Sequence, residues 1–518
     1  MQKDKKYRIS LATCGEIYYT DIEFDAVRQR FSETGAMRLA TDEIGARIRA
    51  GTVAVLGLGI SNFPLVKKLV GMGARVTVHD QKSVAELGAG AAELERAGVR
   101  FVTGDGYLDH LDEDVIFRSP GIRPDAGGIP AALARGACLT SEMEWFMELT
   151  PATVIGVTGS DGKTTTTTVT ALMLEKACER RGYGKTYVGG NIGQSLLPLA
   201  EQMTKEDFAV VELSSFQLMT MRHSPARSAI TNLSPNHLNW HRDMEEYARA
   251  KCNIFSHRGA KRVILNAEND WDCRIAAETA LPVTLFSSVR PSFAAFSGLI
   301  PAGRRGCAAV YARDGKVYCS DGVTESFILD ASSIRLPGKH NLENYMTAIA
   351  LTRGYVSPEI VREVAETFPG VAHRLEYIRT VGGVKYYNSS IDSSPSRTCA
   401  ALSALPERPI VICGGRDKHV PFDPLAAALV ARAKAVVLTG EARGQISDAL
   451  TRAPGFDPEK LPVVTEPLFD DAVRTAKRLA KEGDTVLLSP ACTSFDAFRN
   501  FEERGNRFRD LVNGFPDD

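Results

Sequence analysis

Short apolar runs recur along the chain, each followed by a glycine- or serine-rich turn and then by a segment of helical character. The first is residues 52–56, and a second strand-like run at 75–80 ends in an acid. Runs of four to six aliphatic residues, apolar at nearly every position, are typical of strands that are buried on both faces of a parallel sheet. The pattern therefore predicts an α/β protein whose helices cover open parallel sheets.

The alternation repeats in three successive blocks. Further strand-like runs lie at 114–117, 153–157, 208–213, 227–232, 409–413, 435–439 and 485–488. A chain of 518 residues is long enough for about three domains. We predict three α/β domains, at residues 37–141, 142–370 and 371–518, preceded by an extension of unknown role at residues 1–36.

A candidate phosphate-binding loop is the strongest chemical signal. Residues 158–165 read Thr-Gly-Ser-Asp-Gly-Lys-Thr-Thr, between a strand-like run and a helical segment. In such a turn the backbone N–H groups and the helix N-terminus surround phosphates, Lys163 supplies a cation, and a threonine hydroxyl can bind Mg2+. Val157 replaces the first glycine of the usual G-x-x-x-x-G-K-[ST] pattern. The loop predicts use of a nucleoside triphosphate; the alternative is a helix-capping turn with a solvated lysine.

The first block carries a second nucleotide signal. Residues 57–62 read Gly-Leu-Gly-Ile-Ser-Asn after a strand, and the next strand ends at Asp80. This order is Rossmann-like, although Asn62 stands where a third glycine is usual. A bound nucleotide is favoured over none. A dehydrogenase is a weaker interpretation because no hydride-transfer site accompanies the turn.

Composition narrows the class of protein. Hydrophobic residues make up 44% and charged residues 24%, and the net charge of −1 gives no electrostatic case for a nucleic-acid or membrane partner. The ten cysteines include no C-x-x-C pair, which argues against a disulfide framework or a zinc site and favours a reducing cytosol. We expect a soluble, cytoplasmic protein.

Several longer motifs resemble those of the ATP-dependent Mur ligases of peptidoglycan synthesis. The segment most specific for the D-glutamate-adding branch is 498–505, Phe-Arg-Asn-Phe-Glu-Glu-Arg-Gly, and the Asp-Asn-Pro-Arg tetrapeptide of the diaminopimelate- or lysine-adding branch does not occur. The resemblance covers about residues 45–515. The family has a shorter form of the phosphate-binding loop, which accounts for Val157 in place of the first glycine of the usual pattern. The other matching segments are 158–165, 189–193, 212–217, 336–344, 373–374 and 489–496.

The resemblance implies a fold, a reaction and binding residues. The fold has an N-terminal Rossmann-like domain, a central P-loop mononucleotide-binding domain and a C-terminal Rossmann-like domain. The reaction is the addition of D-glutamate to UDP-N-acetylmuramoyl-L-alanine through an acyl phosphate, with ATP and Mg2+, by an enzyme expected to be monomeric. The implied ATP-binding residues are Gly159, Ser160, Asp161, Gly162, Lys163, Thr164, Thr165, Asn344 and Arg374; those for the UDP substrate are Ile60, Ser61, Asp80, Lys82, Gly121 and Asn191; those for D-glutamate are Ser393, Lys418, Ser494, Phe495 and Phe501.

The resemblance also implies metal ligands and catalytic groups. Phosphorylating a carboxylate brings two anions together, and cations must offset their repulsion. An ammonium cannot ligate a cation, so Lys251 is expected to act as a carbamate. The alternatives are a core or capping imidazole at His237, an exposed helix lysine at Lys251 and a solvated turn lysine at Lys418. The implied metal ligands are Thr164, Glu212, His237 and carbamylated Lys251, and the implied catalytic group is Lys163, His237, Lys251 and Lys418.

The chain departs from the family pattern in the third block. Where the family often shows Asn-Asp-Ser-Lys-Ala-Thr, residues 388–393 read Asn-Ser-Ser-Ile-Asp-Ser, so Ser389 replaces the acid and Ile391 the lysine. Asp392 and Arg397 are candidate substitutes that spacing does not establish. We expect somewhat weaker ATP binding, improved by Ser389→Asp. Asn236, before His237, replaces the family's usual aspartate and is a milder departure.

Two other functions remain open at this point. One is a related ligase, either a Mur-type enzyme for another amino acid or a folylpolyglutamate-type enzyme. The other is a non-catalytic nucleotide-binding homologue, which the changes at Ser389 and Ile391 favour slightly. The joint presence of the metal and lysine groups argues against the second, because a simple binder does not need them.

Overall fold

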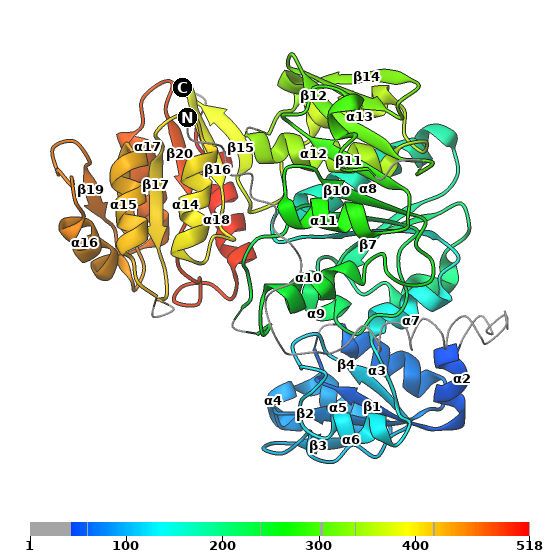
Figure 1. Cartoon of the computed structure of the whole chain (residues 1–518). Coiled ribbons are helices and arrows are strands. Elements are labelled where there is room, and N and C mark those ends of the chain that lie inside the picture. The colour runs from blue at the N-terminus through cyan, green and yellow to red at the C-terminus, as the bar shows by residue number, and fades with distance from the viewer. Residues whose placement is uncertain are drawn as a thin grey trace, which may run out of the picture.

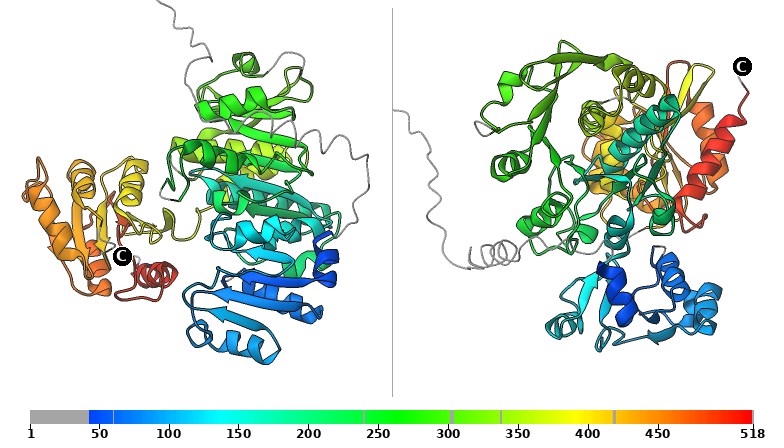
Figure 2. Two further views of the ribbon diagram at one scale, coloured as in Figure 1. Left: turned by 60° about the horizontal axis from the view of Figure 1, so that its bottom comes forward. Right: turned by 90° about the vertical axis from the view of Figure 1, so that its right-hand side faces the viewer.

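The computed structural model describes residues 43–59, 61–238, 240–300, 304–336, 338–417 and 420–516. In these ranges the chain forms three lobes, each built around its own sheet (Figure 1). The C-terminal lobe stands to the side of the other two, as the turned views also show (Figure 2). The predicted α/β fold is confirmed, whereas the predicted extension at 1–36 lies outside the described residues.

The N-terminal lobe is a five-stranded parallel sheet in the order β3-β2-β1-β4-β5. Winding reverses at β1, so the glycine-rich turn after this strand opens at the switch point of the sheet, where ligands bind in such folds. The strands are β1 (Thr52–Leu56), β2 (Arg75–Asp80), β3 (Arg100–Thr103), β4 (Val115–Arg118) and β5 (Cys138–Thr140), and the helices are α2 (Glu43–Ala50), α3 (Asn62–Gly71), α4 (Val84–Leu87), α5 (Ala89–Arg96), α6 (Ile129–Ala134) and α7 (Glu142–Leu149).

The central lobe has nine strands in the order β14-β13-β12-β11-β10-β9-β6-β8-β7. Strands β6 to β12 are parallel, and β13 and β14 add an antiparallel edge. The elements are β6 (Thr153–Thr158), β7 (Thr186–Gly190), β8 (Phe208–Glu212), β9 (Arg227–Ile230), β10 (Arg262–Asn266), β11 (Val283–Ser287), β12 (Ala308–Arg313), β13 (Lys316–Ser320), β14 (Glu325–Asp330), α8 (Lys163–Arg181), α9 (Ser215–Leu218), α10 (Met244–Cys252), α11 (Asp270–Glu278), α12 (Lys339–Thr352) and α13 (Pro358–Thr367).

The C-terminal lobe has six strands in the order β15-β16-β20-β17-β18-β19, parallel except for the edge strand β15. Strand β20 lies between β16 and β17, so the loops after these three strands meet at one edge. The elements are β15 (Glu376–Val381), β16 (Val384–Asn388), β17 (Ile410–Gly414), β18 (Ala435–Thr439), β19 (Val463–Thr465), β20 (Thr485–Leu488), α14 (Pro395–Ala404), α15 (Asp423–Arg432), α16 (Arg443–Arg452), α17 (Phe469–Leu479) and α18 (Phe501–Asn513).

Burial of the parallel strands explains why the sequence pattern predicted them. All residues of β8, β17 and β18 are buried, since helices cover both faces of these sheets. Strands β1, β2, β18 and β20 begin and end at the predicted residues, and the other predicted strands shift by one or two residues at an end. The antiparallel edge strands β14 and β15 were not predicted, because β14 is exposed at four of its six positions and β15 is largely half-buried.

A buried arginine joins the N-terminal and central lobes. Arg118 is 1% exposed, and its Nη1 donates to the carbonyls of Pro120 (3.1 Å) and Ile122 (2.5 Å). Its Nη2 donates across the joint to the carbonyl of Phe216 (2.7 Å) and to Thr220 Oγ1 (3.0 Å). The guanidinium therefore fixes the loop after β4 against α9 of the central lobe.

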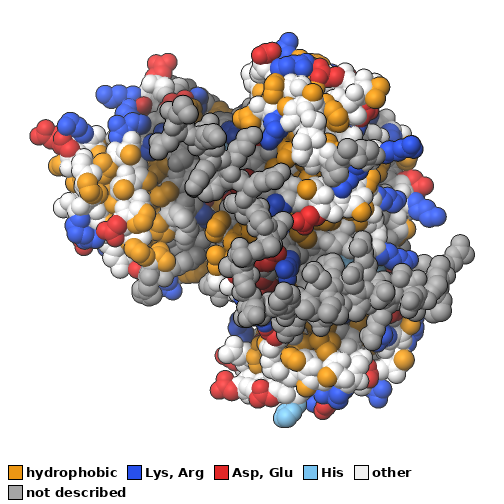
Figure 3. Space-filling model, in the orientation of Figure 1, with side chains coloured by type: hydrophobic (Ala, Val, Ile, Leu, Met, Phe, Trp, Pro, Cys, Tyr) orange, Lys and Arg blue, Asp and Glu red, His pale blue; other side chains and the backbone are white. Residues whose placement is uncertain are grey.

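The face of the molecule seen in Figure 3 carries side chains of both charge signs. Acidic and basic side chains are interspersed over the visible part of the described surface (Figure 3), in line with the net charge of −1. None of the described helices is long and apolar enough to cross a membrane.

Candidate functional site

The loop after β6 forms a cradle at the N-terminus of α8. Gly159 and Gly162 have φ angles of 145° and 77°, which L side chains rarely adopt. A Cβ at Gly159 would also overlap Thr231 Oγ1, and one at Gly162 would overlap Asn344 Oδ1. The first N–H groups of α8 have no acceptor within the helix. These features give a phosphate close access to the backbone and the positive end of a helix.

Asn344 lies directly against this cradle. It is buried on α12, and its Oδ1 accepts a hydrogen bond from Thr166 Oγ1 of α8 (3.2 Å). Ser160, by contrast, is occupied within the protein, since its Oγ accepts from Ser234 N (2.9 Å) and pairs with Tyr247 Oη (3.0 Å). Asn344 can thus contact a nucleotide at the loop, whereas the Ser160 side chain shapes the loop itself.

Two lysines meet at one carbonyl of the cradle. Lys163 Nζ donates to the carbonyls of Gly159 (3.0 Å) and Ser160 (2.9 Å). Lys251 Nζ, from α10, donates to the same Gly159 carbonyl (2.9 Å) and to Thr158 Oγ1 (3.1 Å). Lys251 is 2% exposed, so the interpretation of an exposed helix lysine is excluded. Burial, and then the charge of Lys163, hold the pKa of Lys251 well below its ordinary value, which favours the neutral amine.

A carboxylate with a spare oxygen stands at the end of β8. Glu212 is 1% exposed, and its Oε1 accepts from Asn191 Nδ2 (2.8 Å). Its Oε2 is buried and has no hydrogen-bond partner within the described part of the chain. A buried, unpaired carboxylate oxygen is costly, and it is the donor type that Mg2+ takes. Among the described residues no three His, Cys, Asp or Glu side chains converge on one point, so an ion here would also need hydroxyl, phosphate, carbamate or water ligands.

His237 lies at the mouth of the site rather than in a core. Its residue is exposed, with a φ of 57°, and its ring packs edge-on against Phe216 at 4.9 Å between centroids. Partial burial of its ring, followed by the charges of Lys163, Lys251 and Arg397, lowers the pKa of His237. The imidazole is therefore neutral at physiological pH and keeps a lone pair for a cation or a proton.

The C-terminal lobe supplies charges to the same site. Burial lowers the pKa of Arg374, and Arg397 lowers it further, while Glu212 opposes the shift across the lobe boundary. Asp392 is buried, and its Oδ2 accepts from Ser489 Oγ (2.8 Å). Ser389 also donates to the Asp392 carboxylate, so a carboxylate of this lobe is in contact with the Ser389 hydroxyl.

Of the predicted UDP-binding residues that the structure describes, all but Asn191 gather around the turn after β1. Asp80 accepts from the backbone N–H groups of Leu58 (2.7 Å) and Lys82 (2.9 Å), so its carboxylate braces the turn. Ser61 precedes α3 without capping it, and the carbonyl of Gly121 accepts from Trp240 Nε1 (3.3 Å). Asn191 is separate, beside Glu212 in the central lobe, and Ile60 lies outside the described residues.

Asn62 has a role that the sequence did not reveal. The residue is buried, and its Nδ2 donates to the carbonyl of Gly57 (2.8 Å) and to Ser119 Oγ (3.0 Å). The amide thus ties the turn after β1 to the turn after β4. The missing third glycine of the dinucleotide pattern is the signal that could have drawn attention to this position.

The predicted D-glutamate residues that the structure describes lie at the carboxyl edge of the C-terminal sheet. Ser494 is buried, Phe495 is 59% exposed, and Phe501 begins α18. Ser393 is half-buried after β16, and Lys418 lies outside the described residues. The edge therefore brings together the described members of this set, and Arg504, which sequence reasoning missed, lies among these loops.

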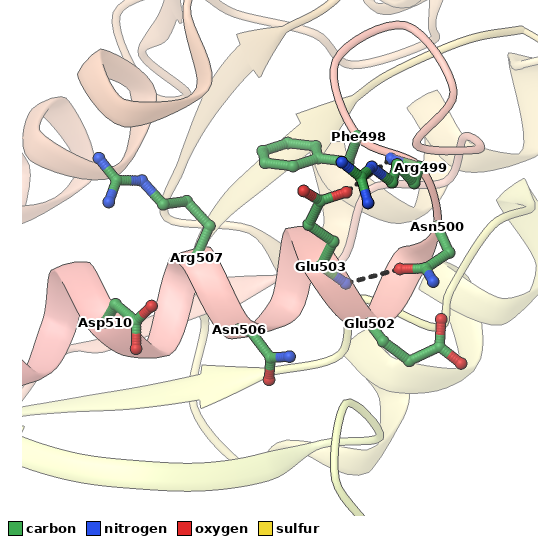
Figure 4. A pocket seen from close by; sticks show the side chains of 8 residues that line it. All are labelled: Phe498, Arg499, Asn500, Glu502, Glu503, Asn506, Arg507 and Asp510. Atoms are coloured by element: carbon green, nitrogen blue, oxygen red, sulfur yellow. Dashed lines mark hydrogen bonds between the residues drawn. The ribbon is translucent and has the colours of Figure 1, made fainter.

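A surface hollow of about 440 Å3 runs along α18 but is a different feature. In Figure 4 its side chains, of both charge signs, line one face of the helix, and Asn500 caps the helix by accepting from Glu503 N (2.8 Å). None of the predicted site residues lines this hollow. Its lining is Phe498, Arg499, Asn500, Glu502, Glu503, Asn506, Arg507 and Asp510.

Comparison with known proteins decides the family. The model of the Mur ligase middle domain matches residues 157–352, and that of the Mur ligase, glutamate ligase domain matches residues 373–492. The UDP-N-acetylmuramoylalanine–D-glutamate ligase of Clostridium novyi is 43% identical over 485 residues, which cover 92% of this chain and 100% of that protein. The chain belongs to the Mur ligase family. The ligase of the same name from Acetivibrio thermocellus is 42% identical over 482 residues, covering 92% and 99% of the two chains.

Solved Mur ligase structures share the fold. MurF from Acinetobacter baumannii superposes with a TM-score of 0.52 at 17% identity, covering 89% of this chain and 90% of that one. UDP-N-acetylmuramate-alanine ligase from Thermotoga maritima gives a TM-score of 0.50 at 18% identity, covering 89% and 99%. At these identities the structures support the three-lobed Mur ligase architecture.

Proposed function

We propose that this Mur ligase adds D-glutamate to UDP-N-acetylmuramoyl-L-alanine, with ATP as the phosphoryl donor. The observation that carries the proposal is the 43% identity, over about nine-tenths of the chain, to ligases named for this reaction. The site supports it, since a phosphate cradle, two lysines and a carboxylate with an unpaired oxygen meet at one sheet edge. The enzyme is an ATP-dependent, amide-bond-forming ligase of peptidoglycan precursor synthesis.

The reaction has two steps with a shared site. The carboxylate of UDP-N-acetylmuramoyl-L-alanine attacks the γ-phosphorus of ATP, which forms an acyl phosphate and releases ADP. The amine of D-glutamate then attacks the acyl carbon, loses a proton and expels phosphate. Lys163 would turn from the carbonyls that it now contacts to the transferring phosphoryl group, whose charge it stabilises.

Thr164, Glu212 and His237 are the residues that would hold Mg2+. The unpaired Oε2 of Glu212 and the lowered pKa of His237 support this assignment. Bound Mg2+ would offset the repulsion between the γ-phosphate and the substrate carboxylate. Asn344 and Arg374 would flank the nucleotide from α12 and from the C-terminal lobe.

We propose that Lys251 carries a carbamate. Its depressed pKa favours the neutral amine, which can add to carbon dioxide with loss of a proton. The modification would place an anion beside Lys163 and replace a donor-only ammonium by oxygens that can accept or ligate. In carbon-13-labelled bicarbonate, wild-type protein should show a carbamate carbon signal that Lys251→Gln lacks. An active, bicarbonate-supplied enzyme with an unmodified Lys251 mass would contradict the assignment.

We further propose a monomeric, cytoplasmic enzyme with domains at 37–141, 142–370 and 371–518. The first domain would bind the UDP substrate through Ser61, Asp80, Lys82 and Gly121, with Asn191 of the second near its muramoyl part. The third would hold D-glutamate through Ser393, Ser494, Phe495 and Phe501, with Lys418 on a substrate carboxylate.

The test is phosphate release from ATP and Mg2+ with UDP-N-acetylmuramoyl-L-alanine and one amino acid at a time. We expect release with D-glutamate and background release with L-glutamate, with L-lysine or without an amino acid. Release that depends on another amino acid would refute the assignment of D-glutamate. Tight uridine-nucleotide binding without any release would refute the ligase and favour a nucleotide-binding homologue.

A further inference from the structure

Arg504 is a buried arginine at the carboxyl edge of the C-terminal sheet. It lies in the first turn of α18 and is 2% exposed. Its guanidinium makes two contacts with Ser390, from Nε to Oγ (3.0 Å) and from Nη2 to the carbonyl (2.9 Å). It also donates from Nη1 to the carbonyl of Thr493 (3.1 Å) and from Nη2 to that of Cys492 (3.2 Å). One side chain thus joins the loops after β16 and β20.

The loop after β17 is attached to the same assembly. Arg416 N donates to the carbonyl of Thr493 (3.0 Å), while Thr493 N and Oγ1 donate back to the carbonyl of Arg416 (3.1 and 3.0 Å). At Gly415, with a φ of 139°, a side chain would overlap the Thr493 carbonyl and lie 3.1 Å from Arg504 Nη1. Three loops from adjacent strands are therefore packed around one guanidinium.

Burial of the Arg504 guanidinium lowers the stability of the fold. All four acceptors of Arg504 are neutral oxygens, so the cation is buried without a carboxylate in hydrogen-bond contact with it. Burial lowers the pKa of Arg504 to about 10, while Asp496 opposes the shift. A planar fork with five donors holds several carbonyls in fixed relative positions, which a lysine cannot do. This cost in stability is consistent with a functional need to hold the loops after β16, β17 and β20 at a fixed spacing.

We propose that Arg504 is a positioning residue for the amino-acid substrate. Both loops to which it is hydrogen-bonded carry a proposed D-glutamate residue within three positions of the contact: Ser393 after Ser390, and Ser494 after Thr493. The guanidinium sets the spacing of these loops and hence the distance between groups that grip the two ends of a dicarboxylate. This inference rests on the proposed function of the same site.

Steady-state kinetics of Arg504→Lys, Arg504→Met and Ser390→Ala test the proposal. Ser390→Ala removes the buried hydroxyl that accepts from Arg504 Nε and keeps the arginine. We expect KM for D-glutamate to rise about 10- to 100-fold in the arginine variants and about 3- to 10-fold in Ser390→Ala, with KM for ATP within about twofold of wild type. The control is Arg507→Met, one turn later on α18, whose exposed guanidinium pairs with Asp470.

Rescue separates positioning from general stability. Guanidinium ion added at millimolar concentration to Arg504→Ala should lower KM for D-glutamate and leave Arg507→Met unchanged. An unaltered KM for D-glutamate in Arg504→Lys and Ser390→Ala would overturn the proposal, as would an equal rise in KM for ATP. Wild-type turnover of a different amino acid would refute the proposed function alone, and the KM of that amino acid would then carry the same comparison.

Discussion

The two glycines at the ends of α8 offer a controlled test of the phosphate cradle. Gly162 precedes the helix with a φ of 77°, and Gly182 follows it with a φ of 76°. A Cβ at Gly182 would meet nothing within 4 Å, whereas one at Gly162 would overlap Asn344 Oδ1. Alanine at either position therefore imposes the same backbone strain on the same helix, but only Gly162→Ala disturbs the cradle.

The expected effects differ in size and in kind. A left-handed alanine costs about 1–2 kcal/mol, which Gly182→Ala should show as a loss of folding free energy. At Gly162 the side chain must also displace Asn344 and break its bond with Thr166, at about 0.5–1.5 kcal/mol. The total of about 1.5–3.5 kcal/mol is the cost of keeping the loop in the shape that binds the nucleotide. We therefore expect kcat/KM for ATP to drop about 10- to 400-fold.

The assay is phosphate release at varied ATP, with thermal unfolding of each variant recorded with and without the nucleotide. Gly182→Ala should keep kcat/KM for ATP within about twofold and retain stabilisation by ATP. Gly162→Ala should lose most of both. Equal kcat/KM values for the two variants would refute the inference that the loop and Asn344 form the ATP site.

Two further predictions concern acids. Ser389→Asp should leave the affinity for ATP unchanged or lower it, contrary to the sequence-based expectation, because the new carboxylate would lie against the buried Asp392. Calorimetric titration with ATP measures this affinity. A tighter complex than that of wild type would refute the prediction. Burial raises the pKa of Glu113, but hydrogen bonds from His79 and Thr77 outweigh it and bring the pKa from 4.5 to about 2. The contribution of the Glu113 carboxylate to the free energy of unfolding is therefore complete above pH 4.5 and is lost as the pH falls towards 2. The loss of unfolding free energy in Glu113→Gln, at most about 3 kcal/mol, should shrink as the pH is lowered. A loss that does not change with pH would contradict this.

The sequence predicted the parts of this molecule that depend on local pattern. Strands β1, β2, β18 and β20 were predicted to the residue because parallel strands covered on both faces read as continuous apolar runs. The cradle was predicted because its glycines and Lys163 lie within one short turn. Glu212 and Lys251 entered through family resemblance, and the structure brings both of them to that turn.

Contacts between distant segments could not be predicted in this way. Arg118 and Arg504 read as ordinary charged positions, since nothing local indicates that each is buried among carbonyls from other elements. The relation between Ser389 and Asp392 likewise depends on how the turn after β16 folds back on itself. Spacing alone therefore left the missing acid unassigned, whereas the structure shows a carboxylate in hydrogen-bond contact with the Ser389 hydroxyl.

The most direct test of the central claim follows one oxygen atom. The enzyme is given ATP, D-glutamate and UDP-N-acetylmuramoyl-L-alanine whose carboxylate is labelled with oxygen-18. The masses of the phosphate and of the nucleotide product are then measured by mass spectrometry. An acyl-phosphate ligase must transfer one labelled oxygen to phosphate for each amide bond formed, and the product must carry one added glutamate. Unlabelled phosphate, or a product that lacks glutamate, would contradict the account.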